Sequence, residues 1–385
     1  MGRFADALAQ PGLTAIAEVK RRSPSAGDLR PDADPASIAA AYERAGAAAV
    51  SILVDERFGG TWDDLRSARA AAALPLLAKG FFTTEDDLRT AREAGADAAL
   101  LLLRDLDDHA AARLVGAAEG LGLETLVEAH DAEELERAVR LDAPVIGVNA
   151  RDLSTFGIDR AEQLRLVASA PRDRVVIAES GIESRAQGAA AELAGADAIL
   201  VGSTLMRAPD PGAKLAELIS RPLVKVCGLT REEDVAIAVE AGADMAGFVL
   251  AAASPRRAPG VLTVPDTMLA VAVVVGEPDG DGADLVQLYT EEEGKVRGRD
   301  AVLLRDGREV ARVVDLPWQE QDPTHLERAR ETTGRVMLAG GLGPENVRDA
   351  IEAVRPWAVD ASSALEVSPG IKDHERVRAY VEAAR

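Results

Sequence analysis

The stretch AILVGSTLMRAPDPGAKLAELISRPLVKVCGLT, residues 198–230, ends one folding unit of this chain and begins a second. Its first part is an apolar run that ends in Gly202 and Ser203 and leads into a helical pattern from about Pro211 to Ser220. Strand, small residues and helix in this order allow backbone amides and a hydroxyl to face an anion beside a helix N-terminus. After Pro222 a new apolar run, LVKVC, brings the only cysteine of the chain to its carboxyl end.

The segment after the cysteine carries the signal of a helix start. Thr230 and Glu233 have the spacing of a capping box, which predicts a helix that begins at Thr230. We therefore expect the boundary between the two units near Pro222.

Apolar runs alternate with helical patterns along the whole chain, which is typical of parallel α/β architecture. Eight runs occur in the first part: TAIAEVK, AAVSILVD, PLLAKGF, AALLLL, ETLVEAH, PVIGVNA, VVIAES and AILVGS. Eight occur in the second: LVKVCGL, MAGFVL, MLAVAVVV, LVQLYT, AVLL, VARVVD, RVMLAGG and WAVDASS, of which the fifth and sixth are crowded.

A repeated motif supports this count. AGAD occurs at residues 94–97, 194–197 and 241–244, with a looser AGAA at residue 45. A glycine that ends a helix, followed by a short loop into a buried strand, is typical of a closed β/α sheet. Because sixteen strands in one open sheet would be exceptional, we predict two tandem (β/α)8 TIM barrels, over residues 1–220 and 221–385.

Charge and composition exclude several classes of protein. The chain has 385 residues with 44 Lys and Arg against 65 Asp and Glu, and the net charge of −21 opposes nucleic acid and anionic membranes as partners. No apolar run is long enough to span a bilayer and no secretory segment opens the chain, so we expect a cytoplasmic protein. One cysteine and four scattered histidines form no metal-ligand cluster, and we expect neither a metal nor a cofactor. The histidines, expected on the surface, are His109, His130, His325 and His374.

In a β/α barrel the chemistry lies at the carboxyl ends of the strands. In the first unit these ends carry polar groups: Glu18, Lys20, Lys79, Glu128, Asn149, Arg151, Glu179, Ser180, Gly202 and Ser203. A lysine flanked by carboxylates stays protonated and can act as a general acid, while a carboxylate opposite accepts a proton. Ser23, Gly202 and Ser203, with the amide of Gly181, would hold a phosphate. For Glu18 and Lys20 the alternative is an interior ion pair with no part in the chemistry.

The motifs IAEVKRRSPS, LAKGFF, LVEAHD, IGVNARDL, AESGI and LVGSTLM resemble the successive strand ends of indole-3-glycerol-phosphate synthase, over roughly residues 3–215. The resemblance implies ring closure of carboxyphenylamino-deoxyribulose phosphate with loss of carbon dioxide and water. It implies Lys79 as general acid on the substrate carbonyl and Glu128 as proton acceptor.

The same resemblance assigns the remaining residues of the first unit. Glu18 and Lys20 match the pair for carboxylate binding and dehydration. Substrate contacts are implied at Asn149, Arg151, Glu179 and Ser180, and aromatic packing at Phe58 and Phe81. Two features differ from the family: Gly80 stands where aspartate usually follows the catalytic lysine, and only about a dozen residues precede the first strand.

In the second unit the candidate residues are Cys227, Arg256, Asp315, Gly340, Gly341, Asp360, Ser362 and Ser363. A lone cysteine is more often a small core residue than a catalyst. Cys227, however, ends a strand before a glycine and a helix, where a helix N-terminus and a bound phosphate would act on its thiolate equilibrium.

VKVCGLT, SPRR, LAGGLGPENV and VDASSALEVSPGIKD resemble phosphoribosylanthranilate isomerase, over about residues 223–385. The resemblance implies an Amadori rearrangement with Cys227 as general base and Asp315 as general acid. It implies that Arg256 holds a substrate carboxylate or phosphate. Asp306 is the alternative acid, although RDGR is more typical of a turn. Tyr289 stands where the family usually has histidine, and LPWQEQDP replaces its glycine-rich loop.

Together these patterns predict a bifunctional tryptophan-biosynthesis enzyme that acts on phosphorylated small molecules, and the fusion favours a monomer. Three alternatives stay open. The second barrel could be slow or non-catalytic, the chain could be a phosphosugar-binding sensor, or it could be another sugar-phosphate isomerase or an aldolase that forms a lysine Schiff base.

Overall fold

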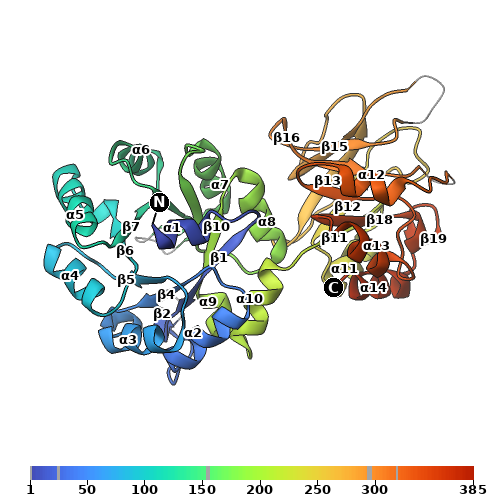
Figure 1. Cartoon of the computed structure of the whole chain (residues 1–385). Coiled ribbons are helices and arrows are strands. Elements are labelled where there is room, and N and C mark those ends of the chain that lie inside the picture. The colour runs from blue at the N-terminus through green and yellow to red at the C-terminus, as the bar shows by residue number, and fades with distance from the viewer. Residues whose placement is uncertain (1, 24–26, 153–156, 293–296, 318–319) are drawn as a thin grey trace. The chain divides into compact units, whose positions relative to one another are not determined.

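The computed structural model describes residues 2–23, 27–152, 157–292, 297–317 and 320–385. It contains two closed eight-stranded barrels, as the alternation of apolar runs predicts (Figure 1). Contacts divide the chain into one unit that takes in residues up to Glu183 and Gly188–Ile219, and a second formed by Ser184–Gln187 and Ser220–Arg385.

The strands of the first barrel all run in the same direction and pair with their neighbours in chain order, with the last strand closing onto the first. They are β1 (Thr14–Val19), β4 (Ala49–Leu53), β5 (Leu76–Lys79), β6 (Ala98–Leu102), β7 (Glu124–Ala129), β8 (Val145–Asn149), β9 (Val175–Glu179) and β10 (Ala198–Val201). Helices lie around them (Figure 1): α2 (Pro35–Arg44), α3 (Trp62–Ala71), α4 (Glu85–Glu93), α5 (Asp108–Gly120), α6 (Ala132–Arg140), α7 (Arg160–Ser169), α8 (Arg185–Ala194), α9 (Ser203–Arg207) and α10 (Pro211–Ile219).

The AGAD motif has two structural functions. Its glycine has a positive φ at each site, +100° at Gly95 and +116° at Gly195, which a residue with a side chain rarely adopts. Its aspartate accepts a hydrogen bond from the amide at or near the start of the preceding strand: Asp97 from Leu76, Asp197 from Val176 and Asp244 from Val224, at 2.7–2.8 Å. The motif therefore ends a helix and joins two adjacent strands.

The first helix, α1 (Arg3–Leu8), packs against the barrel interior. Phe4 and Leu8 are fully buried in the cluster that fills the inside of the sheet. The carboxylate of Glu124, the first residue of β7, accepts hydrogen bonds from the amides of Phe4 and Ala5. Because β7 starts at the amino end of the barrel, this short segment covers the face opposite to the strand ends.

The second barrel also closes with eight strands: β11 (Leu223–Cys227), β12 (Met245–Val249), β13 (Leu269–Val275), β14 (Leu285–Tyr289), β15 (Ala301–Arg305), β16 (Arg308–Val314), β17 (Val336–Leu338) and β18 (Ala358–Ala361). The described part of this unit has four α-helices, α11 (Glu232–Ala241), α12 (His325–Glu331), α13 (Val347–Val354) and α14 (His374–Ala383). The regular alternation predicted for this unit is therefore incomplete.

Strand β15 departs from the expected topology because it is antiparallel to both neighbours. Each parallel crossover needs a dozen or more residues and usually a helix. Two crossovers and the strand between them do not fit into residues 290–314, which join β14 to Asp315. The chain instead turns back at Asp306 and Gly307, whose φ angles of +49° and +74° are those of a tight hairpin turn. The prediction that RDGR forms a turn is confirmed.

The predicted start of α11 is wrong by two residues. The helix begins at Glu232, Arg231 occupies the N-cap position, and no side chain caps it. The hydroxyl of Thr230 donates instead to the carbonyl of Gly370, at 2.5 Å. A partner distant in sequence thus replaces the local capping box.

No helix in the described residues is long and apolar enough to cross a membrane.

We expect Gly307→Ala to destabilise the second barrel, because a left-handed residue with a side chain costs about 1–2 kcal/mol. A loss of 1 kcal/mol corresponds to a fall of roughly 2–4 °C in the melting temperature of a domain of this size, measurable by calorimetry. No atom would crowd the added methyl group, so the cost comes from the backbone alone. Gly260→Ala, at an equally open position without a positive φ, should not lower the melting temperature. Equal melting temperatures for the two variants would contradict the argument.

Candidate active sites

A cavity of about 440 Å³ opens at the carboxyl ends of the strands of the first barrel. Of the residues singled out from the sequence, those lining it are Glu18, Lys20, Ser23, Phe58, Lys79, Phe81, Glu128, Asn149, Arg151, Ser180, Gly181, Gly202 and Ser203. Glu179 is fully buried and contacts Lys79. The structure therefore brings every first-barrel candidate to one place. The sequence reasoning missed the apolar walls of the cavity, which include Leu53, Leu100 and Leu200.

Lys79 lies at the centre of the site, at the end of β5. Its Nζ atom is 2.6 Å from Glu179 Oε2, 3.6 Å from Glu128 Oε2 and 3.7 Å from Glu18 Oε2. Burial lowers the pKa of Lys79, but the three carboxylates outweigh burial and raise it above its ordinary value. Lys79 is therefore a protonated ammonium group at neutral pH.

The carboxylates around Lys79 differ from one another. Burial acts to raise the pKa of Glu128, but Lys79, His130 and Asn149 outweigh it and lower the pKa to about 2. Burial and the charge of Glu128 raise the pKa of Glu179 to about 8, although Lys79 opposes them. Glu128 is therefore the stronger acid of the pair. Two carboxyl groups with separated pKa values can take separate acid and base functions.

Glycine on β8 makes room for this cluster. A side chain at Gly147 would place its Cβ atom 2.1 Å from Glu179 Oε1, an atom that has no hydrogen-bond partner. Glu179 therefore occupies the space that a side chain on the neighbouring strand would fill.

Glu18 and Lys20 form a second ion pair on β1, with 2.6 Å between Glu18 Oε1 and Lys20 Nζ. A Cβ atom on Gly202 would lie 2.2 Å from that same Glu18 oxygen and 2.9 Å from the ammonium nitrogen. The pair is thus held directly against the end of β10, beside Ser203. Because Lys79 also faces Glu18, the two pairs form one continuous charged cluster.

His130 is not a surface residue, contrary to the expectation from the sequence. Its Nε2 atom is 3.1 Å from Glu128 Oε1, its Nδ1 atom is 3.0 Å from Glu134 Oε2, and its side chain is only 12% exposed. Burial lowers its pKa, but the two carboxylates raise it to about 9. The position directly after LVEA, two residues from Glu128 along the strand, was the signal that could have identified it.

The other three histidines differ in their exposure to solvent. His109 is exposed, as expected. His325 is buried, and its Nε2 atom lies 2.8 Å from the carbonyl of Ala339, so the surface expectation is wrong there. His374 is partly exposed and lies 3.0 Å from Asp234.

Aromatic and basic groups line the outer part of the cavity. The rings of Phe58 and Phe81 are stacked with 6.4 Å between their centres, and the Arg57 guanidinium lies 3.7 Å over Phe81. Arg151 and Arg207 are close enough that burial together with Arg207 lowers the pKa of Arg151. Neighbouring cations of this kind bind an anionic substrate group. The sequence reasoning missed Arg207.

The second barrel has a buried ammonium group of its own. Lys225 on β11 is completely buried, and its Nζ atom is 2.8 Å from both Asp360 Oδ2 and Gln287 Oε1. Cys227, two residues further along the strand, shares its face. A Cβ atom on Gly247 of β12 would lie 2.7 Å from Cys227 Sγ and 2.9 Å from Lys225 Cε. This glycine leaves the space in which both side chains pack.

Burial and nearby charges change the pKa of the Cys227 thiol. Burial raises its pKa and the charge of Asp360 adds to the effect, while Lys225 and Lys372 act in the opposite direction. Cys227 is thus a protonated thiol at neutral pH in this state of the protein.

Asp315 lies directly after β16 and is buried. Its Oδ2 atom accepts hydrogen bonds from the Tyr289 hydroxyl at 2.6 Å and from Arg297 Nη2 at 2.7 Å. The alternative residue, Asp306, occupies the exposed hairpin turn, which precedes β16 and so lies at the opposite end of that strand.

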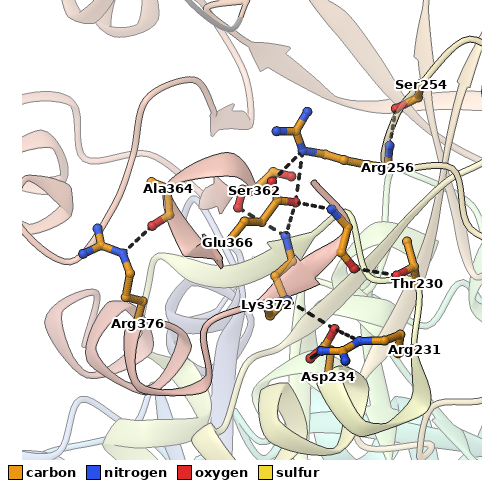
Figure 2. Close-up of polar contacts among 11 residues, drawn as sticks. Thr230, Arg231, Asp234, Ser254, Arg256, Ser362, Ala364, Glu366, Lys372 and Arg376 are labelled. Carbon is orange, nitrogen blue, oxygen red and sulfur yellow. Dashed lines mark hydrogen bonds and ion pairs between the residues drawn. The ribbon is translucent and has the colours of Figure 1, made fainter. Parts of the chain in front are cut away.

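Arg256 lies in the loop after β12 and is bound within a network that includes a two-stranded hairpin, β19 (Glu366–Ser368) with β20 (Ile371–Lys372). Its Nε atom is 2.9 Å from Glu366 Oε2, and the buried Lys372 Nζ is 2.9 Å from Glu366 Oε1 (Figure 2). Lys372 also donates to the carbonyl of Ser362 at 3.2 Å.

Glycines and serines complete this end of the second barrel. Gly340 has a φ of +88°, and a Cβ atom there would lie 2.4 Å from the amide of Leu316, so only glycine fits beside Asp315. Gly341 follows with a φ of +68°. Ser362 begins the turn after β18, and Ser363 starts its 3-10 helix, Ser363–Leu365. All second-barrel candidates therefore lie at or just beyond the carboxyl ends of strands.

The only cysteine of the chain allows a direct test of its environment. The rate of alkylation by iodoacetamide, followed by mass spectrometry, should rise at a higher pH than for free cysteine, because the thiolate reacts and burial raises the thiol pKa. Asp360→Asn removes a charge that raises this pKa and should shift the profile to lower pH. Asp281→Asn, in the loop before β14, should leave it unchanged. A wild-type profile like that of free cysteine would contradict the buried site.

Sequence comparisons identify both units. The family model of indole-3-glycerol phosphate synthase matches residues 2–218, and that of N-(5'phosphoribosyl)anthranilate isomerase matches residues 319–383. Indole-3-glycerol phosphate synthase of Streptomyces griseus is 47% identical over 215 residues, which cover 56% of this chain and 80% of the relative.

Further matches include a relative that covers almost the whole chain. Tryptophan biosynthesis protein TrpCF of Yersinia pestis is 34% identical over 99% of this chain and 87% of its own length. A crystal structure of TrpF from Jonesia denitrificans is 30% identical and covers 43% of this chain and 97% of that one, with a TM-score of 0.34. The chain belongs to the indole-3-glycerol phosphate synthase family, in the bifunctional form in which a phosphoribosylanthranilate isomerase barrel of tryptophan biosynthesis follows the synthase barrel.

Proposed function

We propose that each barrel carries one independent catalytic centre and that the two act on consecutive phosphorylated intermediates. The isomerase barrel converts phosphoribosylanthranilate to carboxyphenylamino-deoxyribulose phosphate, and the synthase barrel closes the indole ring. The observation that carries the proposal for the synthase is the position of Lys79, within 3.7 Å of three carboxylates from three other strands.

In the synthase barrel we assign Lys79 as the general acid and Glu128 as the proton acceptor. The three carboxylates keep Lys79 protonated, which an acid toward a carbonyl oxygen requires. Glu128 stays ionised and has an oxygen, Oε2, without a hydrogen-bond partner. Asn149 Nδ2 holds its other oxygen at 2.8 Å and so fixes the orientation of the carboxylate.

We assign the remaining first-barrel residues to substrate binding and dehydration. The Glu18 and Lys20 pair serves carboxylate binding and loss of water, and Glu179 and Ser180 contact the substrate. Phe58 and Phe81 pack against its aromatic ring. Ser23, Gly181, Gly202 and Ser203 hold the phosphate, with Arg151 beside them.

In the isomerase barrel we assign the thiolate form of Cys227, which is the minor form in this state of the protein, as the general base, and Asp315 as the general acid. Arg256 binds a substrate carboxylate or phosphate in exchange for its contact with Glu366. Gly340, Gly341, Ser362 and Ser363 contribute backbone and hydroxyl groups to phosphate binding, and Asp360 orients Lys225 beside the thiol. We also propose that the fused chain is monomeric, which light scattering on the purified protein tests.

A substitution in one catalytic centre should lower the activity of that centre and leave the activity of the other unchanged. We expect Lys79→Ala to lower synthase turnover by about 10²–10⁴-fold, the usual contribution of a general acid, and to leave isomerase turnover unchanged. Cys227→Ala should do the reverse. Steady-state assays with each substrate measure both. If either substitution abolished both activities in a protein with a wild-type melting profile, that result would contradict the assignment of two independent sites.

The second barrel has one alternative, a slow or non-catalytic partner of the synthase, favoured by the reversed strand β15 and by Tyr289. Isomerase turnover that Asp315→Asn abolishes would exclude it. We expect such turnover, because Asp315 lies at the carboxyl end of its strand and is buried. Turnover that persists in Asp315→Asn would reject this residue as the acid.

His130 should contribute to the lower pH limit of the synthase, through the pKa of Glu128. Glu128 must be ionised to accept a proton, so activity falls as pH falls through its pKa. That pKa reflects Lys79, His130 and Asn149, together with the charges of Glu18 and Glu179. His130→Asn removes one cation that lowers the pKa of Glu128. We expect kcat/KM to begin its decline at a pH about one unit higher than in the wild type.

The matched control for this prediction is His109→Asn, a substitution at an exposed histidine. Its pH profile should coincide with that of the wild type. A profile of His130→Asn that is lower in amplitude but unshifted would show that His130 has only a structural function.

A further inference from the structure

The reversed strand places the residues that precede it beside the isomerase centre. In a parallel barrel, residues that enter a strand lie at the face opposite to the active site. Ala301, the first residue of β15, pairs with Tyr289 on one side and with Val313 on the other. Tyr289 and Val313 stand at or near the carboxyl ends of their strands, so residues 297–300 lie at the rim that carries Asp315.

This arrangement places the side chain of Arg297 beside Asp315. Its Nη2 atom donates to Asp315 Oδ2 at 2.7 Å, and its guanidinium lies 3.9 Å from the centre of the Tyr289 ring. Its Nη1 atom donates to the carbonyls of Gly298 and Arg299, at 3.0 and 3.1 Å. These contacts fix the guanidinium in one orientation.

Tyr289 holds the same carboxylate from the neighbouring strand. Its hydroxyl donates to Asp315 Oδ2 at 2.6 Å and accepts a hydrogen bond from Gln287 Nε2 at 2.7 Å. Gln287 in turn accepts from Lys225, the buried ammonium two residues from Cys227. One row of hydrogen bonds therefore joins the strand of the thiol to Asp315.

Asp315 thus receives donors on both oxygens. Tyr289 and Arg297 reach Oδ2, and the amide of Leu316 reaches Oδ1 at 2.7 Å. Donors on both oxygens prevent rotation of the carboxyl group.

We propose that Arg297 and Tyr289 are positioning residues of the isomerase reaction, which hold Asp315 in the orientation for proton transfer. This inference rests on the proposed function of Asp315 as the acid. The two residues perform their function together, although one comes from a strand end and the other from the loop before a reversed strand.

The experiment compares Arg297→Gln and Tyr289→Phe with the wild type in the full chain, using phosphoribosylanthranilate as substrate. Each substitution should lower isomerase kcat by about 10-fold or more, since a hydrogen bond to a charged group contributes about 1.5–3 kcal/mol. KM should stay within about two-fold, because neither residue is assigned to substrate binding. The double variant should lose less than the product of the two single losses, because both residues act on one carboxylate.

Two controls separate positioning from a structural function. Arg299→Gln, two residues along, removes a side chain that pairs with Asp322 rather than Asp315, and it should keep wild-type isomerase kcat. Guanidinium ion added to Arg297→Ala should restore part of the lost kcat, which a folding defect would not permit. Synthase turnover, measured on the same sample, should be equal in all variants.

The outcomes decide between the alternatives. Wild-type kcat in Arg297→Gln and in Tyr289→Phe would overturn the inference, and so would a rise in KM without a fall in kcat, since that identifies a substrate contact. Full activity in Asp315→Asn would instead reject the assigned acid and with it the function of both positioning residues. If Arg297→Gln fails to fold, Tyr289→Phe and the guanidinium experiment still test the inference.

Discussion

The direction of the strands is the constraint on which both active sites depend. In a closed sheet whose strands all run one way, every strand ends at the same rim, so side chains far apart in the chain meet there. Lys79 and Glu179 are separated by 100 residues, yet their charged atoms are 2.6 Å apart. In the second barrel one strand runs the other way. In that barrel the residues that precede β15, and not those that follow it, lie at the rim that carries the active site.

Each barrel contains a lysine that is removed from water and neutralised by carboxylates. An isolated buried ammonium would be very unfavourable, and its cost falls only when opposite charges and hydrogen bonds surround it. Lys79 meets Glu179, Glu128 and Glu18, and Lys225 meets Asp360 and Gln287. In both barrels a glycine on an adjacent strand makes the room, Gly147 beside Glu179 and Gly247 beside Lys225. The same packing solution therefore occurs twice in one chain.

The shortened middle of the second barrel shows how a closed sheet tolerates the loss of a helix. A two-residue turn at Asp306 and Gly307 replaces a crossover, and the sheet still closes with eight strands. The change alters the rim as well as the topology. Arg297 lies beside Asp315, and Tyr289, which stands where the family usually has histidine, contacts the same carboxylate.

The two barrels could be predicted from the sequence, because the sixteen apolar runs and the AGAD repeats reflect local periodicity and turn chemistry. The sequence also determined which polar residues end the strands, since position along a strand is a local property. Three features depend on the tertiary structure: the direction of β15, the burial of His325 and the partner of Thr230. Strand direction is set by the length of chain available between distant pairing partners. A side chain's charge and hydrogen bonds are set by neighbours from other strands, and no local pattern records either.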